Sequence, residues 1–231
     1  MQAGKEAARL LNESISVNGS ARVILASAPS QNELLDILLA APGVAWSRVT
    51  IFHMDEYIGL PADHPATFRA YQQEHILSRI KPEVFHGIRG EASDPIAECA
   101  RYSALLRAAP IDLVCLGIGE NGHLAFNDPP VADFDDPALV KPVDLDALCR
   151  QQQVNDGCFP NLESVPTTAL TLTIPALFSS RAIVGAVPGS RKARAVHDTL
   201  KGPVSTACPA SILRAHSNAA LYLDRESAAV L

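Results

Sequence analysis

A glycine-rich stretch at residues 116–130, LGIGENGHLAFNDPP, brings together several residue types that could carry chemistry. It follows an apolar run, and Gly117, Gly119 and Gly122 have the G-x-G-x-x-G spacing of a dinucleotide-binding turn. Such a turn needs a helix that begins at its third glycine, because the free N–H groups of that helix bind the pyrophosphate. The two prolines at the end of the stretch leave little room for a helix, so the sequence disfavours a nicotinamide cofactor.

The same turn presents His123 and Asp128 after a predicted strand. Histidine can transfer protons near neutral pH, and a nearby carboxylate can orient the ring and favour its charged form. The alternative is that His123 only hydrogen-bonds the loop that holds it. The glycine-rich context leaves these two interpretations about equally favoured.

A second candidate is HMDEYIG at residues 53–59, which places Asp55 and Glu56 at the end of another predicted strand. Adjacent residues of an extended segment point to opposite faces, so only one of the two should face a ligand crevice. Partial burial beside Phe52 and Tyr57 would raise the basicity of Asp55 towards that of a general base. A solvated acidic loop is the simpler alternative.

Two further segments, ASAPSQ at 26–31 and PGSRKA at 188–193, put small hydroxyl residues at predicted helix starts. Free N–H groups, the hydroxyls of Ser27, Ser30 and Ser190, and the Lys192 ammonium would together suit a phosphate. An S-x-x-E capping box starting at Ser30 would explain that serine without a ligand. Lys192 could equally be a solvated lysine.

Apolar strand patterns alternate with helical patterns along most of the chain. Strands are expected at Arg22–Ala26, Arg48–His53, Leu113–Leu116, Ala169–Ile174, Arg181–Val187 and Ala220–Leu223, and helices at Gln31–Leu39, Pro65–Ile80, Pro95–Ala108, Arg191–Leu200 and Pro209–Arg214. This alternation predicts an α/β fold with a doubly wound, mostly parallel sheet and helices on both faces, as a single domain over residues 1–231. Ligands bind such sheets beyond the carboxyl ends of the strands, where all four segments fall. The Asp- and Pro-rich residues 129–166 are expected to form a long surface excursion.

The composition of the chain limits the kinds of partner and metal site that we expect. The chain has 231 residues and a formal net charge of −6, and its 19 Lys and Arg residues form no dense run, so no nucleic-acid partner is expected. No apolar stretch is long enough to span a bilayer, and the five cysteines are scattered without a C-x-x-C pair. We therefore expect a cytoplasmic protein with no membrane partner, no disulfide framework and no thiolate zinc site. A homo-oligomer is compatible with the sequence.

With these segments together, the chain resembles the glucosamine-6-phosphate deaminase/isomerase family, whose relatives include the 6-phosphogluconolactonases. FHMDEYIGL at 52–60 is similar to the family's M-D-E-Y-x-G signature, and GIGENGHLAFNDP at 117–129 to G-x-G-x-D-G-H-x-A-F-N-E-P. GSRKA at 189–193 is similar to the family's phosphate-site G-S-x-K-A.

The resemblance implies a phosphorylated amino sugar as substrate, with no metal and no organic cofactor. Asp55 matches the family's base that moves a proton between C2 and C1, and His123 matches the acid/base that opens the sugar ring, with Asn121 and Asp128 beside it. Lys192 matches the phosphate lysine. Further substrate or phosphate contacts are implied for a set of loop residues: Ser27, Ala28, Ser30, Gly122 and Ser190.

The chain departs from the family pattern in three places. Asn121 replaces an aspartate two residues before the histidine, and Asp128 replaces a glutamate five residues after it. The loop at 26–30 lacks the family's glycines, and 131–136 is acidic where allosteric members are basic. We expect a deaminase that converts glucosamine 6-phosphate, or a close hexosamine phosphate, to fructose 6-phosphate and ammonia. The alternatives are an isomerase or lactonase of another sugar phosphate, and a non-catalytic sugar-phosphate sensor.

Overall fold

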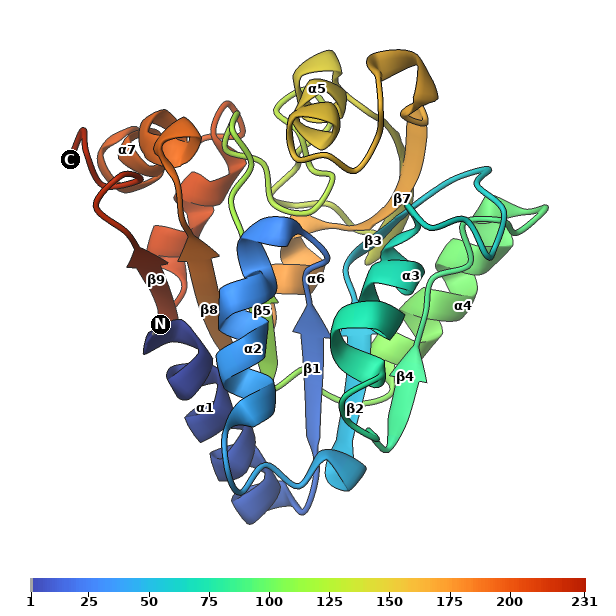
Figure 1. Cartoon of the computed structure of the whole chain (residues 1–231), viewed down its shortest axis with the longest axis vertical. Coiled ribbons are helices and arrows are strands. Elements are labelled where there is room, and N and C mark those ends of the chain that lie inside the picture. Colours follow the sequence, from blue (N-terminus) through green and yellow to red (C-terminus); the bar gives the residue numbers. More distant parts are fainter. Residues whose placement is uncertain (1) are drawn as a thin grey trace.

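A computed structural model describes residues 2–231 and has a six-stranded parallel sheet between two layers of helices (Figure 1). The strand order is β4-β2-β1-β5-β8-β9, which confirms the predicted doubly wound α/β fold. The bounds of these strands are β1 Ala21–Leu25, β2 Val49–His53, β4 Val84–His86, β5 Leu113–Leu116, β8 Ala182–Val187 and β9 Ala219–Leu223. The chain builds outward from β1 to one edge and then from β5 to the other, so the strand order reverses between β1 and β5.

Alternating strand residues separate the core into two faces. On β1, Val23 and Leu25 belong to a cluster with α1 and α2, whereas Ile24 belongs to a cluster with α4, α6 and α7 on the other face. These strands are covered on both sides, which explains their nearly continuous apolar sequences. The helices are α1 Gln2–Asn18, α2 Asn32–Ala40, α3 Phe68–Gln72, α4 Pro95–Arg107, α5 Ala147–Asn155, α6 Ile174–Phe178 and α7 Ala193–Lys201.

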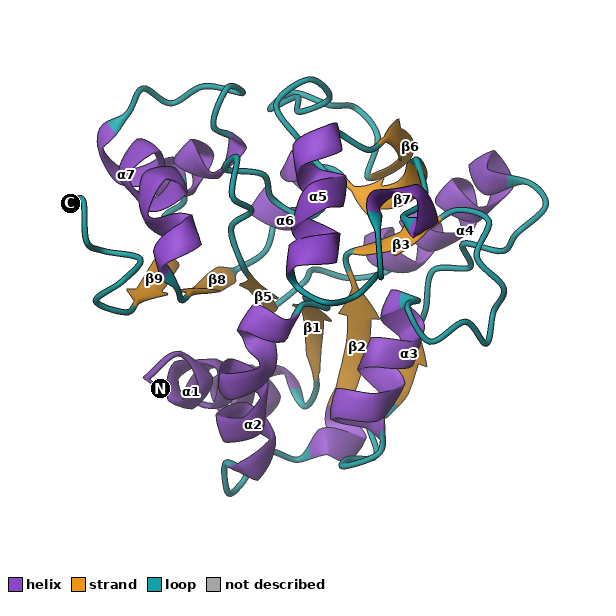
Figure 2. Ribbon diagram, turned by 45° about the horizontal axis from the view of Figure 1, so that its top comes forward, coloured by secondary structure: helices purple, strands orange, loops and turns teal. Residues whose placement is uncertain are grey.

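A second, antiparallel sheet lies beyond the carboxyl ends of the main strands (Figure 2). Its order is β3-β7-β6, with bounds β3 Asp55–Tyr57, β6 Val140–Asp144 and β7 Thr168–Leu172. The strand expected at Ala169–Ile174 therefore lies in this smaller sheet. It ends early because Thr173 caps the start of α6, its side chain accepting a hydrogen bond from the Ala176 N–H.

The prediction that residues 129–166 form only a surface excursion is wrong. This segment contributes β6 to the second sheet and the helix α5, and it places Val143 and Cys149 in a buried aromatic cluster with Tyr57. Sequence analysis missed β6 because it is short and contains Pro142, and it missed α5 because that helix carries three consecutive glutamines rather than an apolar stripe. The Asp146 side chain, which caps α5 by accepting from the Leu148 N–H, was the available signal.

Other helix predictions need smaller corrections. Ser30 does not form the expected capping box, because α2 begins after Gln31 with no side-chain cap and the Ser30 hydroxyl accepts a hydrogen bond from Gln31 instead. The helix expected over 65–80 is α3 continued by a π-helical turn (η3, Gln73–Leu77), and Pro209–Ala215 forms a 3-10 helix (η6). No helix within residues 2–231 is long and apolar enough to cross a membrane.

His53, at the end of β2, provides a test of this packing. The side chain is fully buried, its Nε2 accepts the Ile88 N–H at 2.7 Å, and burial together with the charge of Arg69 lowers the pKa of His53 from 6.5 to about 3. Below pH 6.5 the His53 side chain takes up a proton in the unfolded chain but stays neutral in the folded one. The free energy of unfolding therefore decreases as the pH falls towards 3.

Phenylalanine at this position would not titrate, but it would leave the Ile88 N–H unpaired. We expect His53→Phe to cost about 1–3 kcal/mol at pH 7, and this difference to shrink by about 2 kcal/mol at pH 5. Urea unfolding of both proteins at each pH measures it. A difference that stays constant would show that His53 has the same protonation in the folded and unfolded states.

Candidate active site

A pocket opens beyond the carboxyl ends of β1, β2 and β5, where the strand order reverses. The loop after β1 contributes Ser27, Ala28 and Ser30 to it, and β3 contributes Asp55. The glycine-rich turn after β5 contributes His123. The rest of the lining is Ala26, Met54, Phe68, Gly117, Ile118, Gly119, Ala125, Phe126, Gln152, Gln153 and Lys192.

Asp55 and Glu56 point in opposite directions, as the sequence predicts. Asp55 lines the pocket, and burial followed by the charge of Glu56 raises the pKa of the Asp55 carboxyl well above its ordinary value. Glu56 is fully buried and accepts hydrogen bonds from the N–H groups of Tyr57, Phe68 and Arg69 at 2.9–3.0 Å. Glu56 thus holds the segment that carries Phe68 against β3, and leaves Asp55 as the carboxylate available to a ligand.

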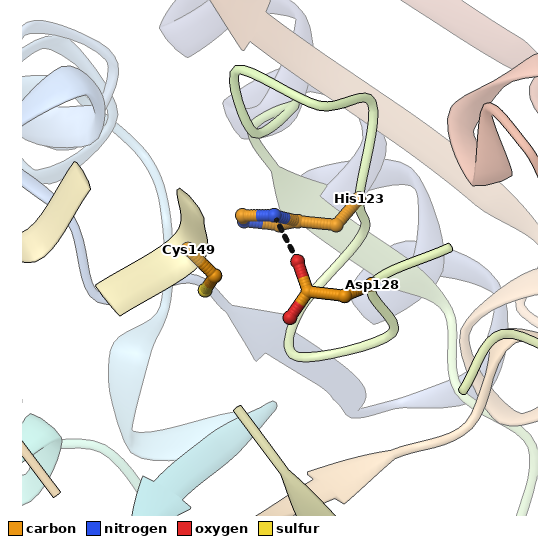
Figure 3. Close-up of side chains that lie close together, drawn as sticks. All are labelled: His123, Asp128 and Cys149. Carbon is orange, nitrogen blue, oxygen red and sulfur yellow. Dashed lines mark ion pairs between the residues drawn. The ribbon is translucent and has the colours of Figure 1, made fainter. Parts of the chain in front are cut away.

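His123 lies in a hydrogen-bonded cluster with Asn121 and Asp128 (Figure 3). Its Nδ1 is 2.7 Å from Oδ1 of Asn121 and 2.9 Å from Oδ1 of Asp128. The Asn121 amide also donates to that Asp128 oxygen at 2.8 Å, and its own oxygen accepts the His123 N–H at 3.1 Å. Both neighbours of Nδ1 are acceptors, so we assign the proton of the neutral ring to Nδ1, which leaves Nε2 free to exchange a proton with a ligand.

Asp128 has electrostatics opposite to those of Asp55. Burial alone would raise its pKa, but the hydrogen bond and charge of His123, with further hydrogen bonds from Asn121 and Cys149, hold the pKa of Asp128 below its ordinary value. Asp128 therefore stays ionised behind the imidazole. The pocket thus contains one carboxylate that gains a proton readily and, behind the histidine, one that does not.

Cys149 on α5 completes the cluster, with ligand-type atoms of His123, Asp128 and Cys149 all within 4.8 Å of one another (Figure 3). These are residue types that can bind a transition metal. Burial and the neighbouring Asp128 charge, however, strongly raise the pKa of the Cys149 thiol, and metals bind the thiolate. Asp128 is also already hydrogen-bonded to His123, so the arrangement fits a proton-transfer pair better than a metal centre.

The glycines of the turn are needed for packing rather than for a dinucleotide. A Cβ on Gly119 would lie 2.2 Å from Cε1 of the His123 ring, and a Cβ on Gly117 would lie 2.8 Å from Nε2 of Gln31. Gly122 has a positive φ of 85° and packs on Cys208, outside the pocket lining. No helix begins after Gly122, which agrees with the argument against a nicotinamide site.

Lys192 also lines the pocket, from the short 3-10 helix η5 (Ser190–Lys192). Its side chain is buried, which lowers the pKa of Lys192, and it forms no ion pair with any carboxylate of residues 2–231. Ser30 and Lys192 also border a second, adjoining hollow, which contains Ser190. The four groups predicted for a phosphate are thus close together, although Ser190 does not line the main pocket.

Sequence analysis missed the two glutamines of the pocket lining, Gln152 and Gln153 of α5. Gln152 accepts a hydrogen bond from the Glu120 N–H at 3.0 Å, which fastens α5 to the glycine-rich turn. Both side chains reach the pocket because α5 lies beyond the carboxyl ends of the central strands (Figure 2). No motif in the sequence marks them.

Comparisons with known proteins agree on one family. The sequence profile of the glucosamine-6-phosphate isomerases/6-phosphogluconolactonases matches residues 1–222. A glucosamine-6-phosphate deaminase of Listeria innocua is 35% identical over 98% of this chain and 94% of its own length. One from Exiguobacterium sibiricum is 39% identical over 80% of this chain and 71% of its own length.

Solved structures give the same result. A monomeric glucosamine-6-phosphate deaminase superposes with a TM-score of 0.90 at 32% identity, covering 99% of this chain and 95% of that one. A 6-phosphogluconolactonase from Shewanella baltica shares the fold, with a TM-score of 0.75 at 22% identity over 96% of this chain and 90% of that one.

Gly119→Ala tests the packing of the imidazole. The added methyl overlaps the His123 ring, so we expect a loss of about 1–3 kcal/mol of stability in urea unfolding. Removing the ring should relieve that overlap, so Gly119→Ala should cost much less when introduced into His123→Ala. Equal costs in both backgrounds would show that the ring does not lie against Gly119.

Proposed function

The chain belongs to the glucosamine-6-phosphate isomerase/6-phosphogluconolactonase family, and we propose that it is a deaminase that converts glucosamine 6-phosphate and water to fructose 6-phosphate and ammonia. The 35–39% identity to proteins named as deaminases, against 22% or less to the lactonase structures, supports the deaminase over the lactonase alternative. The sugar would bind in the pocket beyond β1 and β5.

The observation that carries this proposal is the contrast between the two carboxylates. Asp55 has a raised pKa and lines the pocket, whereas Asp128 has a lowered pKa and lies behind His123. Titratable groups whose environments separate their pKa values are typical of acid/base chemistry. An isomerisation that opens a ring and then moves a proton between adjacent carbons needs two separate proton-transfer groups, which here are His123, with the ionised Asp128 behind it, and Asp55.

In the proposed reaction, Nε2 of His123 takes the proton of the C1 hydroxyl and delivers it to the ring oxygen, so the bond between C1 and the ring oxygen breaks and the sugar opens to its aldehyde. Asp128 stabilises the imidazole while it exchanges this proton. The Asp55 carboxylate then takes the proton from C2 and returns it at C1, while a second proton passes from the C2 amine to the C1 oxygen, which gives a ketimine at C2 and a hydroxyl at C1. Water attacks C2 of that ketimine, and ammonia leaves. Lys192 and the hydroxyls of the loop after β1 would hold the 6-phosphate.

Asn121 is the departure that keeps the sensor alternative open, and its contacts favour the enzyme. An aspartate at this position would add a second carboxylate within hydrogen-bond distance of Asp128. The amide instead accepts from the His123 ring and donates to Asp128, so the cluster stays connected with a single negative charge. We therefore assign Asn121 a positioning role for the histidine.

Release of ammonia from glucosamine 6-phosphate tests the function directly. An enzyme should produce ammonia and fructose 6-phosphate in equal amounts, whereas a sensor should bind the sugar and release none. N-acetylglucosamine 6-phosphate serves as a control, because its acetylated nitrogen cannot leave as ammonia. Hydrolysis of a 6-phosphogluconolactone without any ammonia release would favour the lactonase alternative.

Asp55→Asn should abolish turnover and leave sugar-phosphate binding largely intact. The amide has nearly the same shape as the carboxylate, but it cannot accept the C2 proton. Steady-state kinetics and titration calorimetry with glucosamine 6-phosphate measure the two effects. If the variant retains more than about a few per cent of the original kcat, Asp55 is not the base.

Lys192→Ala should weaken the binding of phosphorylated sugars without disrupting the fold. A charge-assisted contact to phosphate contributes about 1.5–3 kcal/mol, so the dissociation constant should rise tenfold or more. Lys192→Arg is the matched control that keeps the charge, and it should retain part of the affinity. An unchanged dissociation constant in Lys192→Ala would exclude Lys192 from the phosphate site.

A further inference from the structure

Arg191, the neighbour of Lys192, connects three segments of the chain. Its Nη1 is 3.1 Å from Oε1 of Glu120, and its Nη2 is 2.6 Å from Oδ1 of Asp156. Glu120 belongs to the glycine-rich turn, and Asp156 follows the last residue of α5. One guanidinium therefore joins η5, the turn that carries His123 and the helix that covers the pocket.

Gln152 closes this contact into a ring. It accepts from the Glu120 N–H at 3.0 Å, and its own amide donates to Oδ2 of Asp156 at 3.4 Å. Asp156 is only 17% exposed and Glu120 30% exposed. The two carboxylates are thus held in place by neighbours and cannot turn freely into solvent.

This arrangement puts negative charge beside the proposed phosphate contacts. Asp156, Asp224 and Glu226 border the same hollow as Ser190 and Lys192. The carboxylates of Asp156 and Glu120 are near enough for their charges to act on the Lys192 ammonium, as does the opposing charge of Arg191. Among residues 2–231, Arg191 and Lys192 are the two cations of this hollow, against the carboxylates of Asp156, Asp224 and Glu226, so loss of Arg191 would make the net charge more negative where a phosphate dianion has to bind.

We propose that Arg191 is a specificity-determining residue for the phosphate group, and that it acts by neutralising Asp156 and Glu120 rather than by touching the phosphate. Its guanidinium already pairs with these two carboxylates, whereas the Lys192 ammonium forms no ion pair with a carboxylate of the described residues 2–231. This inference rests on the proposed function only for the position of the phosphate beside Lys192. It adds a residue that sets the affinity of that site.

The test is a charge-compensation cycle read by calorimetric titration with inorganic phosphate at low ionic strength. Arg191→Gln should raise the dissociation constant about tenfold, and this increase should diminish in high salt. Adding Asp156→Asn to Arg191→Gln removes the exposed negative charge, so the double variant should return to within about threefold of the original protein. With glucosamine 6-phosphate, Arg191→Gln should raise KM and change kcat much less.

Arg194→Gln is the matched control. Arg194 lies on α7 three positions after Arg191, is 82% exposed and pairs only with Asp198 among the described carboxylates, so its loss changes the net charge equally without affecting the ring. It should leave phosphate binding unchanged. An equal weakening in both arginine variants would overturn the proposal, because any cation in this part of the chain would then have the same effect.

Two other results would also overturn it. If Arg191→Gln binds phosphate as tightly as the original protein, neutralisation is not needed. If the double variant stays as weak as Arg191→Gln, Arg191 contacts the phosphate directly. These outcomes do not depend on the reaction, because a protein that binds phosphate and releases no ammonia would contradict the deaminase proposal and still decide the role of Arg191. A Lys192→Ala variant that binds phosphate normally would place the site elsewhere and overturn both the site and this inference.

Discussion

The arrangement of the site depends on one close contact, the imidazole of His123 against the backbone of Gly119. No side chain larger than hydrogen fits at Gly119, since a Cβ would overlap the ring. The contact sets the position of Nδ1 between Asn121 and Asp128 and leaves Nε2 for a ligand. Ala125, at the far side of the turn, is the one non-glycine of residues 2–231 with a positive φ, at 51°. The turn therefore carries backbone strain close to the histidine, a common feature of functional sites.

Burial raises the pKa of each of the acidic groups Asp55, Glu56 and Asp128, and hydrogen bonds and neighbouring charges decide whether the net shift is upward or downward. The Asp55 carboxylate is buried beside the charge of Glu56 and has no hydrogen-bond or ion-pair partner among residues 2–231 that would stabilise its own charge, so its pKa rises. Asp128 is also buried, but hydrogen bonds from His123 and Asn121 and the charge of His123 stabilise its carboxylate, so its pKa falls. Glu56 has three backbone N–H donors, yet burial dominates and raises the pKa of Glu56 to about 7. Side chains of the same chemical type therefore differ in protonation because their neighbours differ.

Residues 129–166 connect the cluster of His123 and Asp128 with the charged groups near Lys192. The helix α5 places Cys149 beside Asp128, Gln152 and Gln153 in the pocket wall, and Asp156 against Arg191 at its end. A shift of this helix would alter the histidine cluster and the charge balance near Lys192 together. The His123 cluster and the charges near Lys192 thus contact the same short helix.

The sequence by itself determined the class of fold and the segments that surround the pocket. Apolar runs separated by helical patterns leave few alternatives to a parallel sheet, and in such a sheet the loops after β1, β2, β5 and β8 must meet at one edge. The alternation of residues along a strand also determined that Asp55 and Glu56 face opposite ways. Only the tertiary structure decided which of them faces the pocket. The backbone N–H groups of residues 68 and 69, which are distant in sequence, donate to the Glu56 carboxylate and hold it away from the pocket. The tertiary structure likewise decided the role of α5 and the ring around Arg191, since charges that meet across three separate loops leave no periodic signal in any one of them.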